Sequence, residues 1–199
     1  MKKFLSVFPM ILLITSFGLV GCSQESSNST EVENAPEANS SGPLTINTEL
    51  PSDQEILSKG PHGETAVSAT TLELSEQDME KIKKGKYTAA IVMHYAGNDW
   101  AKAQIDGLKS SFKRMGVEIV AVTDAQFKPE KQVSDIETVL AKDPDLIVSI
   151  PVDPVSTAAA YKKAVEAGVK LVFMDNTPSG LEAGKDYVSI VSADNYGNG

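Results

Sequence analysis

The sequence predicts an α/β fold whose main part is a doubly wound parallel sheet over residues 87–199. Short apolar runs alternate along this part of the chain with segments that are apolar on one helical face only. Strands that are apolar throughout are typical of parallel sheets covered by helices on both faces. A portion of this length also falls within the ~50–250 residues usual for one domain with a single core.

The elements of this domain follow in a regular order. Strands are expected at residues 87–94, 117–123, 145–150, 170–174 and 187–191. The first helix is expected to begin near Asn98 and to end at Gly116, and the second to begin at Pro129. The third is expected to begin at Pro154, with Asp153 as its N-cap. In the second helix the predicted apolar stripe is Val133, Ile136 and Leu140.

The N-terminal residues 1–21 have the pattern of a lipoprotein signal peptide. Lys2 and Lys3 precede an apolar run that reaches Val20 and is short for a membrane span of ~20 residues. The run ends in "LVGC", which resembles the bacterial lipobox, and Cys22 is the only cysteine of the chain. The resemblance implies acylation of Cys22, with palmitate as a typical chain, and a protein anchored to the extracytoplasmic face of the cell membrane. A lone cysteine cannot form an internal disulfide. The alternative to acylation is therefore a free thiol that lies after the apolar run by chance.

Two segments connect this signal to the domain. Residues 22–50 are poor in apolar side chains and are expected to form a flexible tether. Residues 51–86 are expected to form an N-terminal extension with one short helix. Ser75 is its predicted N-cap, with Asp78 three residues later, and Gly85 is its predicted end.

Composition and motifs exclude several classes of function. The chain has 27 acidic against 18 basic residues and a formal net charge of −9, which argues against a nucleic-acid partner. It has no G-x-S-x-G elbow, no P-loop and no G-x-G-x-x-G after a strand, so neither an enzyme nor a cofactor is expected. The only histidines are His62 and His94, which argues against a zinc site.

Polar side chains gather where the predicted strands end. Ligands of open parallel sheets bind outside the carboxyl ends of the strands. Carboxylates and amides there can bond hydroxyl groups, and an indole face can cover the C–H side of a sugar ring. The sequence therefore predicts a polyhydroxylated ligand. The candidate ligand-binding residues are Asn98, Asp99, Trp100, Asp124, Asp175 and Asn176, and Asp153, Asp194 and Asn195 also follow strands.

Each candidate also has a structural interpretation. Trp100 either stacks on ligand or holds the first helix against the sheet, and Asn98 and Asp99 either cap that helix or contact ligand. Asp124 either stabilises a turn or contacts ligand. Asp175 precedes no obvious helix, so ligand contact is favoured for it and its replacement by alanine is expected to leave folding nearly unaffected.

Four stretches carry a resemblance to a known family. They are "AAIVMHYAGNDWAKAQIDGLKSSFKRMGVEIV", "IPVDP", "AGVKLVFMDN" and "VSIVSADNYGNG", and together they cover nearly all of residues 87–199. The domain resembles the N-terminal lobe of type I periplasmic binding proteins, in the ribose-binding-like branch that serves sugar ABC transporters. The resemblance implies that Asp175 holds sugar hydroxyls, that Trp100 lies near stacking aromatics, and that "SADN" begins the crossing to a second lobe. That second lobe is expected to be missing from this chain.

Two departures from the ribose-type pattern bear on the ligand. Asp175-Asn176 stands where Asp-Arg is frequent, and Ile150-Pro151 stands where Asn-Pro is frequent. The expected ligand is therefore a sugar, polyol or amino sugar rather than ribose in particular. The expected function is a membrane-anchored, extracytoplasmic solute-binding protein that passes this ligand to the permease subunits of an ABC importer. The alternative is a sensor component that presents its ligand to a chemotaxis or kinase receptor.

Overall fold

The computed structural model of the chain describes residues 44–45 and 55–196. The predicted signal peptide with Cys22, and nearly all of the predicted tether, lie outside the described residues. The described residues all belong to one compact unit, so the described part of the extension and the domain are part of the same body. Among the described residues, no helix is both long and apolar enough to cross a bilayer.

The described elements are four α-helices, one short 3-10 turn and seven strands. The helices are α1 (Glu76–Gly85), α2 (Asp99–Met115), α3 (Pro129–Leu140) and α4 (Ala158–Glu166), and the 3-10 turn is Ala69–Thr71. The strands are β1 (Leu44–Thr45), β2 (Glu73–Leu74), β3 (Thr88–Met93), β4 (Glu118–Asp124), β5 (Leu146–Ser149), β6 (Lys170–Met174) and β7 (Ser189–Val191). β1 and β2 form an antiparallel pair. The other strands form one sheet in the order β4-β3-β5-β6-β7, with every pair parallel.

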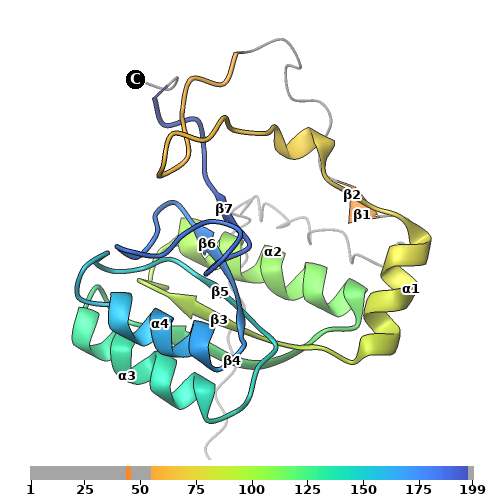
Figure 1. Cartoon of the computed structure of the whole chain (residues 1–199). Coiled ribbons are helices and arrows are strands. Elements are labelled where there is room, and N and C mark those ends of the chain that lie inside the picture. Colours follow the sequence, from red (N-terminus) through yellow and green to blue (C-terminus); the bar gives the residue numbers. More distant parts are fainter. Residues whose placement is uncertain (1–43, 46–54, 197–199) are drawn as a thin grey trace, which may run out of the picture. The chain divides into compact units, whose positions relative to one another are not determined.

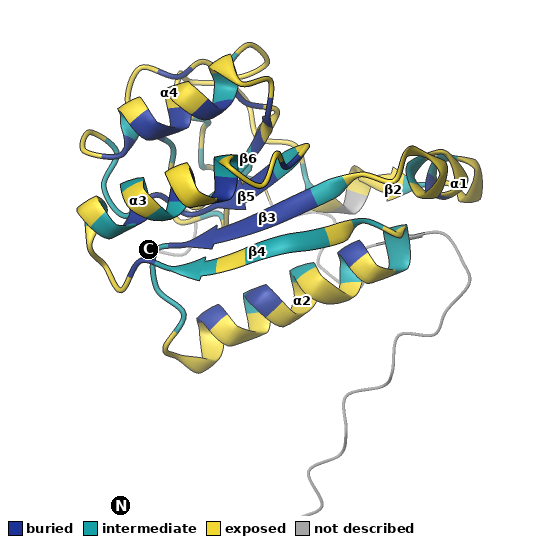
Figure 2. Cartoon of the chain, turned by 90° about the horizontal axis from the view of Figure 1, so that it is seen from below, coloured by how far each residue is buried: buried dark blue, intermediate teal, exposed yellow. Residues whose placement is uncertain are grey.

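Helices cover both faces of this sheet, which confirms the predicted doubly wound fold. α3 and α4 lie on one face and α2 on the other, as Figures 1 and 2 show. β3 serves both layers because its side chains alternate between the faces. Ala90 and Val92 belong to the core beneath α3 and α4. The core beneath α2 contains the residues of the other face, which are Ala89, Ile91 and Met93.

Helix ends follow local rules that the sequence made visible. The Ser75 hydroxyl accepts a hydrogen bond from the backbone N–H of Asp78 at 3.2 Å, as predicted for α1. α1 ends at Gly85, as predicted, and the left-handed cap residue is the next one, Lys86, with a φ of 52°. α2 ends as predicted at Gly116, whose φ of 69° suits a residue without Cβ.

The start of α4 differs from the prediction. The helix begins at Ala158 and not at Pro154, and turns occupy the residues between Asp153 and the helix. The Thr157 hydroxyl donates to the Asp153 carbonyl at 2.6 Å, and the helical N–H bond to that carbonyl is stretched to 3.3 Å. Such a side-chain bond competes with helix formation. Asp153 therefore caps a turn, through the backbone N–H of Ser156 at 2.6 Å, and hydrogen bonding to Ser156 lowers its pKa.

Candidate functional site

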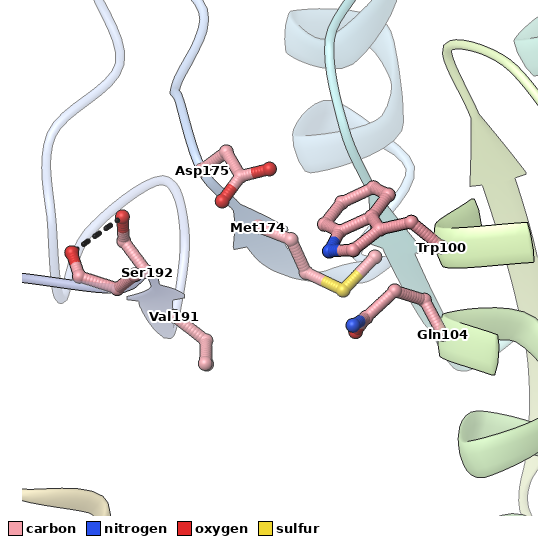
Figure 3. Close-up of a pocket in the computed structure, with 7 residues that line it drawn as sticks. Trp100, Gln104, Met174, Asp175, Val191 and Ser192 are labelled. Atoms are coloured by element: carbon pink, nitrogen blue, oxygen red, sulfur yellow. Dashed lines mark hydrogen bonds between the residues drawn. The ribbon is translucent and has the colours of Figure 1, made fainter. Parts of the chain in front are cut away.

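A pocket of about 190 Å³ lies at the carboxyl edge of the sheet. It is formed by the start of α2, the end of β6 and the residues that follow β7 (Figure 3). Met174 and Val191 are register partners, so β6 and β7 end at the same level and their next residues share this edge. The pocket therefore occupies the position predicted for ligands of open parallel sheets. Its lining residues are Trp100, Gln104, Met174, Asp175, Val191, Ser192 and Ala193.

Asp175 is fixed by its backbone and has an available side chain. Its N–H donates to the carbonyl of Val191 at 3.0 Å, and its φ of 63° is left-handed. Asp and Asn accept this conformation better than most residues because their short polar side chains interact locally. The side chain is exposed, and within the described part of the chain its carboxylate accepts no hydrogen bond. Both carboxylate oxygens are therefore available to a ligand.

Trp100 lies in the first turn of α2 and faces the same pocket. Its side chain is 49% exposed, and its indole meets the His94 ring edge-on at 6.4 Å between centroids. In Figure 3 the indole points toward Met174 and Asp175. The packing of α2 against the sheet rests instead on its buried residues Ala101, Ile105 and Phe112. Trp100 thus lines the pocket, and its contact with a ligand stays a prediction.

The His94 ring packs against the Trp100 indole as part of an aromatic cluster. Its ring also meets Phe127 edge-on at 5.1 Å, and Phe127 stacks on Tyr95 at 4.6 Å. Burial lowers the pKa of His94, and the negative charges of Asp175 and Asp124 oppose that shift without reversing it. The lowered pKa favours the uncharged form of the His94 ring, which packs edge-on against the indole.

The other four candidates do not line the pocket. Asn98 caps α2, since its side-chain oxygen accepts from the N–H of Ala101 at 2.8 Å. The Asp124 carboxylate accepts from the N–H of Gln126 at 2.8 Å, in the turn after β4, and from the N–H of Ala96 at 3.2 Å, in the loop after β3. Asp99 lies exposed in the first turn of α2, and Asn176 follows Asp175 and is exposed. These positions bear out the structural interpretations of Asn98 and Asp124, while ligand contact by any of the four stays a prediction.

Several pocket residues were not among the candidates. Gln104 lies one helical turn after Trp100, and this spacing of four residues places both on one face of α2. That spacing is the signal that identifies it. Met174 and Val191 depend on the pairing of β6 with β7, which no local pattern shows. Ser192 and Ala193 belong to the "SADN" stretch. In that stretch only Asp194 and Asn195 have the carboxylate or amide side chains by which the candidates were chosen.

The pocket combines an available carboxylate, an amide and a half-exposed indole. These groups suit hydrogen bonding to hydroxyls together with contact to an apolar ring face. Among the described residues, no group of three or more His, Cys, Asp or Glu is placed to hold a metal ion. The fold and the site are those of an α/β lobe with a small polar-ligand pocket at the edge of its sheet.

Comparison with protein families gives the same result. A family model described as "Periplasmic binding protein domain" matches residues 89–199, which is more than half of the chain. The chain belongs to this family, and the resemblance stated from the sequence motifs is confirmed.

Individual relatives match only part of their own length. The ribose import binding protein RbsB of Bacillus subtilis (strain 168) is 27% identical over 116 residues, which are 58% of this chain and 36% of that protein. The chain thus spans about a third of the length of this curated relative. A solute-binding protein from Agrobacterium vitis, solved with alpha-D-tagatopyranose, is 24% identical with a TM-score of 0.49, covering 55% of this chain and 39% of that one. The arabinose-binding protein AraP of Geobacillus stearothermophilus is 26% identical with a TM-score of 0.45, covering 49% and 34%.

Proposed function

We propose that this chain carries one ligand-binding lobe of a non-enzymatic solute-binding protein, which captures a sugar or sugar-like solute for an ABC importer. The observation that carries the proposal is that Asp175 and Trp100 line one pocket. A carboxylate that accepts hydroxyl hydrogen bonds beside an indole that covers a ring face is a combination suited to a sugar. Membership of the periplasmic binding protein family supports a binding role.

The charge of the pocket narrows the class of ligand. Among the described residues that line it, Asp175 is the only charged one, and none is a lysine, arginine or histidine. An anionic solute would meet an uncompensated carboxylate there, at a cost that burial under a second lobe would increase. Neutral sugars, polyols and amino sugars avoid this cost. An amino sugar would add a charge-assisted hydrogen bond to Asp175.

Sugar binding by this chain is expected to be weak. The pocket that the described residues form has a volume of about 190 Å³, below the ~300–1,000 Å³ of typical small-molecule sites. Closure of two lobes around a ligand is a hinge motion that one lobe cannot make. We expect its affinity for D-ribose, D-allose, glycerol or D-glucosamine to be at least about 100-fold below that of a complete two-lobed protein, a difference of roughly 2.8 kcal/mol.

Thermal-shift and calorimetric titration of the whole chain with these four compounds measures this, because a ligand that binds only the native state raises the Tm. The ribose import binding protein with D-ribose is the positive control, and Trp100→Ala is the matched pocket variant. A sugar-dependent shift that disappears in Trp100→Ala supports the proposal. An affinity equal to that of the two-lobed control contradicts the argument from lobe closure, and no shift with any compound contradicts the ligand class.

Membrane anchoring through Cys22 is a further part of the proposed function. Cys22 is the only cysteine, so Cys22→Ala is expected to abolish lipidation and to leave the protein unprocessed or released. Two or more acyl chains give stable anchoring, each buried methylene contributing ~0.8 kcal/mol. Metabolic labelling with a radioactive fatty acid, followed by membrane fractionation, measures the effect. Cys22→Ser serves as a second variant, and label retained on either variant contradicts acylation at this position.

A further inference from the structure

A segment of the N-terminal extension is bonded to the chain that follows β7. We call residues 57–65 the strap, and Figure 1 shows this part of the extension beside the chain that leaves β7. The Asp194 carboxylate accepts from the N–H of Leu57 at 3.0 Å, and from the N–H and hydroxyl of Ser58 at 2.9 and 2.6 Å. The Ser58 hydroxyl in turn accepts from the N–H of Tyr196 at 3.1 Å. One carboxylate and one hydroxyl thus join segments at least 136 positions apart.

The strap has a second attachment to the lobe. Lys59 and Thr65 pair across a tight turn, and within it the Glu64 carboxylate accepts from the N–H of His62 at 2.9 Å. The His62 ring Nε2 lies 3.3 Å from the carbonyl of Leu181, in the loop between β6 and β7. In the same loop, burial raises the pKa of Tyr187, and the negative charge of Glu64 raises it further. The strap is therefore attached to the lobe at two points, which restricts its rotation about either of them.

The first attachment lies next to the pocket. β7 ends at Val191, whose carbonyl is held by the N–H of Asp175. Ser192 and Ala193 follow as an exposed wall of the pocket, outside the sheet. Asp194 comes directly after them. Ser192 and Ala193 therefore lie between two fixed points. One is the end of the pairing between β6 and β7, and the other is the set of hydrogen bonds from the strap to Asp194.

We propose that the strap positions the pocket wall, with Ser58 and Asp194 as positioning residues. In the ligand-free chain the strap fixes Ser192 and Ala193 opposite Trp100, so that a ligand does not have to order them. Preorganisation of this kind raises affinity because ordering costs are already met before binding. The N-terminal extension is on this view part of the binding unit. The inference rests on the proposed function only where it assigns the pocket to a sugar.

Hydrogen exchange of the ligand-free whole chain tests the strap without any ligand. In Ser58→Ala and Asp194→Asn, backbone amides of residues 191–196 are expected to exchange at least about tenfold faster, because hydrogen bonds to a charged group hold the segment closed. Ser58→Thr keeps the hydroxyl and should keep the protection. Thr71→Ala is the matched control, since it removes a hydroxyl bond within the extension, to the carbonyl of Ser68 at 2.7 Å. Unchanged exchange at 191–196 in both test variants overturns the proposal.

Titration with D-allose, a neutral aldohexose, tests the consequence for the pocket. Trp100 is the only tryptophan of the chain, so its fluorescence reports on the pocket directly. Ser58→Ala is expected to weaken D-allose binding by about threefold or more while its Tm falls no further than that of Thr71→Ala, a split that a purely structural role does not produce. Equal affinity in Ser58→Ala and the parent overturns positioning. If the parent binds no D-allose, the assignment of the pocket to a neutral sugar fails, and the exchange measurement alone decides the strap.

Discussion

Asp175→Asn is expected to weaken sugar binding by about 10- to 100-fold and to leave the Tm nearly unchanged. The carboxylate has no hydrogen-bond partner among the described residues, so the fold loses no bond that the structure shows. A ligand loses a charge-assisted bond, and hydrogen bonds to charged groups contribute roughly 1.5–3 kcal/mol, with about 1.4 kcal/mol for each tenfold in affinity. Asparagine keeps the shape of the side chain and accepts the left-handed backbone at this position.

The same backbone makes Asp175→Ala a less informative variant, which corrects the expectation drawn from the sequence. Asp175 caps no helix, but its φ of 63° means that alanine there costs roughly 1–2 kcal/mol of stability. The affinity for a sugar, by calorimetry, and the Tm should be measured together for both variants. The protein used should be a two-lobed form whose sugar binding is strong enough to measure. Asp153→Ala is the control, because its carboxylate stabilises a turn at the same edge and should affect the Tm more than affinity. If Asp175→Asn melts early and binds normally, Asp175 is structural.

Gln132→Leu is expected to lower the free energy of unfolding by about 2–4 kcal/mol, since each unpaired buried group costs about 1–3 kcal/mol. Gln132 is fully buried in α3, at 0% exposure. Its amide nitrogen donates to the carbonyl of Ile150 at 2.8 Å, and its amide oxygen accepts from the N–H of Val152 at 2.7 Å. Leucine fills a similar volume but leaves both backbone groups without these partners. The loop after β5 would lose the bonds that hold it.

Urea unfolding of the two proteins at equal m-values measures this difference. Gln77→Leu is the matched control, since Gln77 is exposed in α1 and such surface changes usually stay within about 0.5 kcal/mol. A loss for Gln132→Leu no larger than for Gln77→Leu contradicts the argument that the amide satisfies buried backbone groups.

Gln132 also marks a limit of what the sequence predicts about the fold. The alternation of apolar runs and amphipathic segments predicted every strand of the parallel sheet and each of its helices, because burial of one face is a local pattern. Gln132 stands beside the predicted stripe of α3, where a polar residue is read as solvated. Its partners lie 18 and 20 positions later in the chain, and no periodicity reports such a bond.

The candidate site was predictable where a residue follows a strand of known direction. Trp100 and Asp175 both do, and the structure brings them to one pocket. Asn98 and Asp124 follow strands as well, but their side chains turn back to bond local N–H groups, and the choice depends on backbone geometry that the sequence does not display. The role of Asp194 depends on a contact with the extension that spans 136 positions, beyond any local pattern.

The central position of β3 has a consequence for how the chain is made. β3 is the first strand of the parallel sheet to be synthesised, and its residues 89–93 are fully buried in the finished lobe. One neighbour, β5, arrives much later, since Thr88 bonds to Asp145 across 57 positions. Until then the nascent chain presents the run "AAIVM", a segment of the apolar, strand-forming kind that drives aggregation. Lys83, Lys84 and Lys86 stand just ahead of it, where like charges keep neighbouring nascent chains apart.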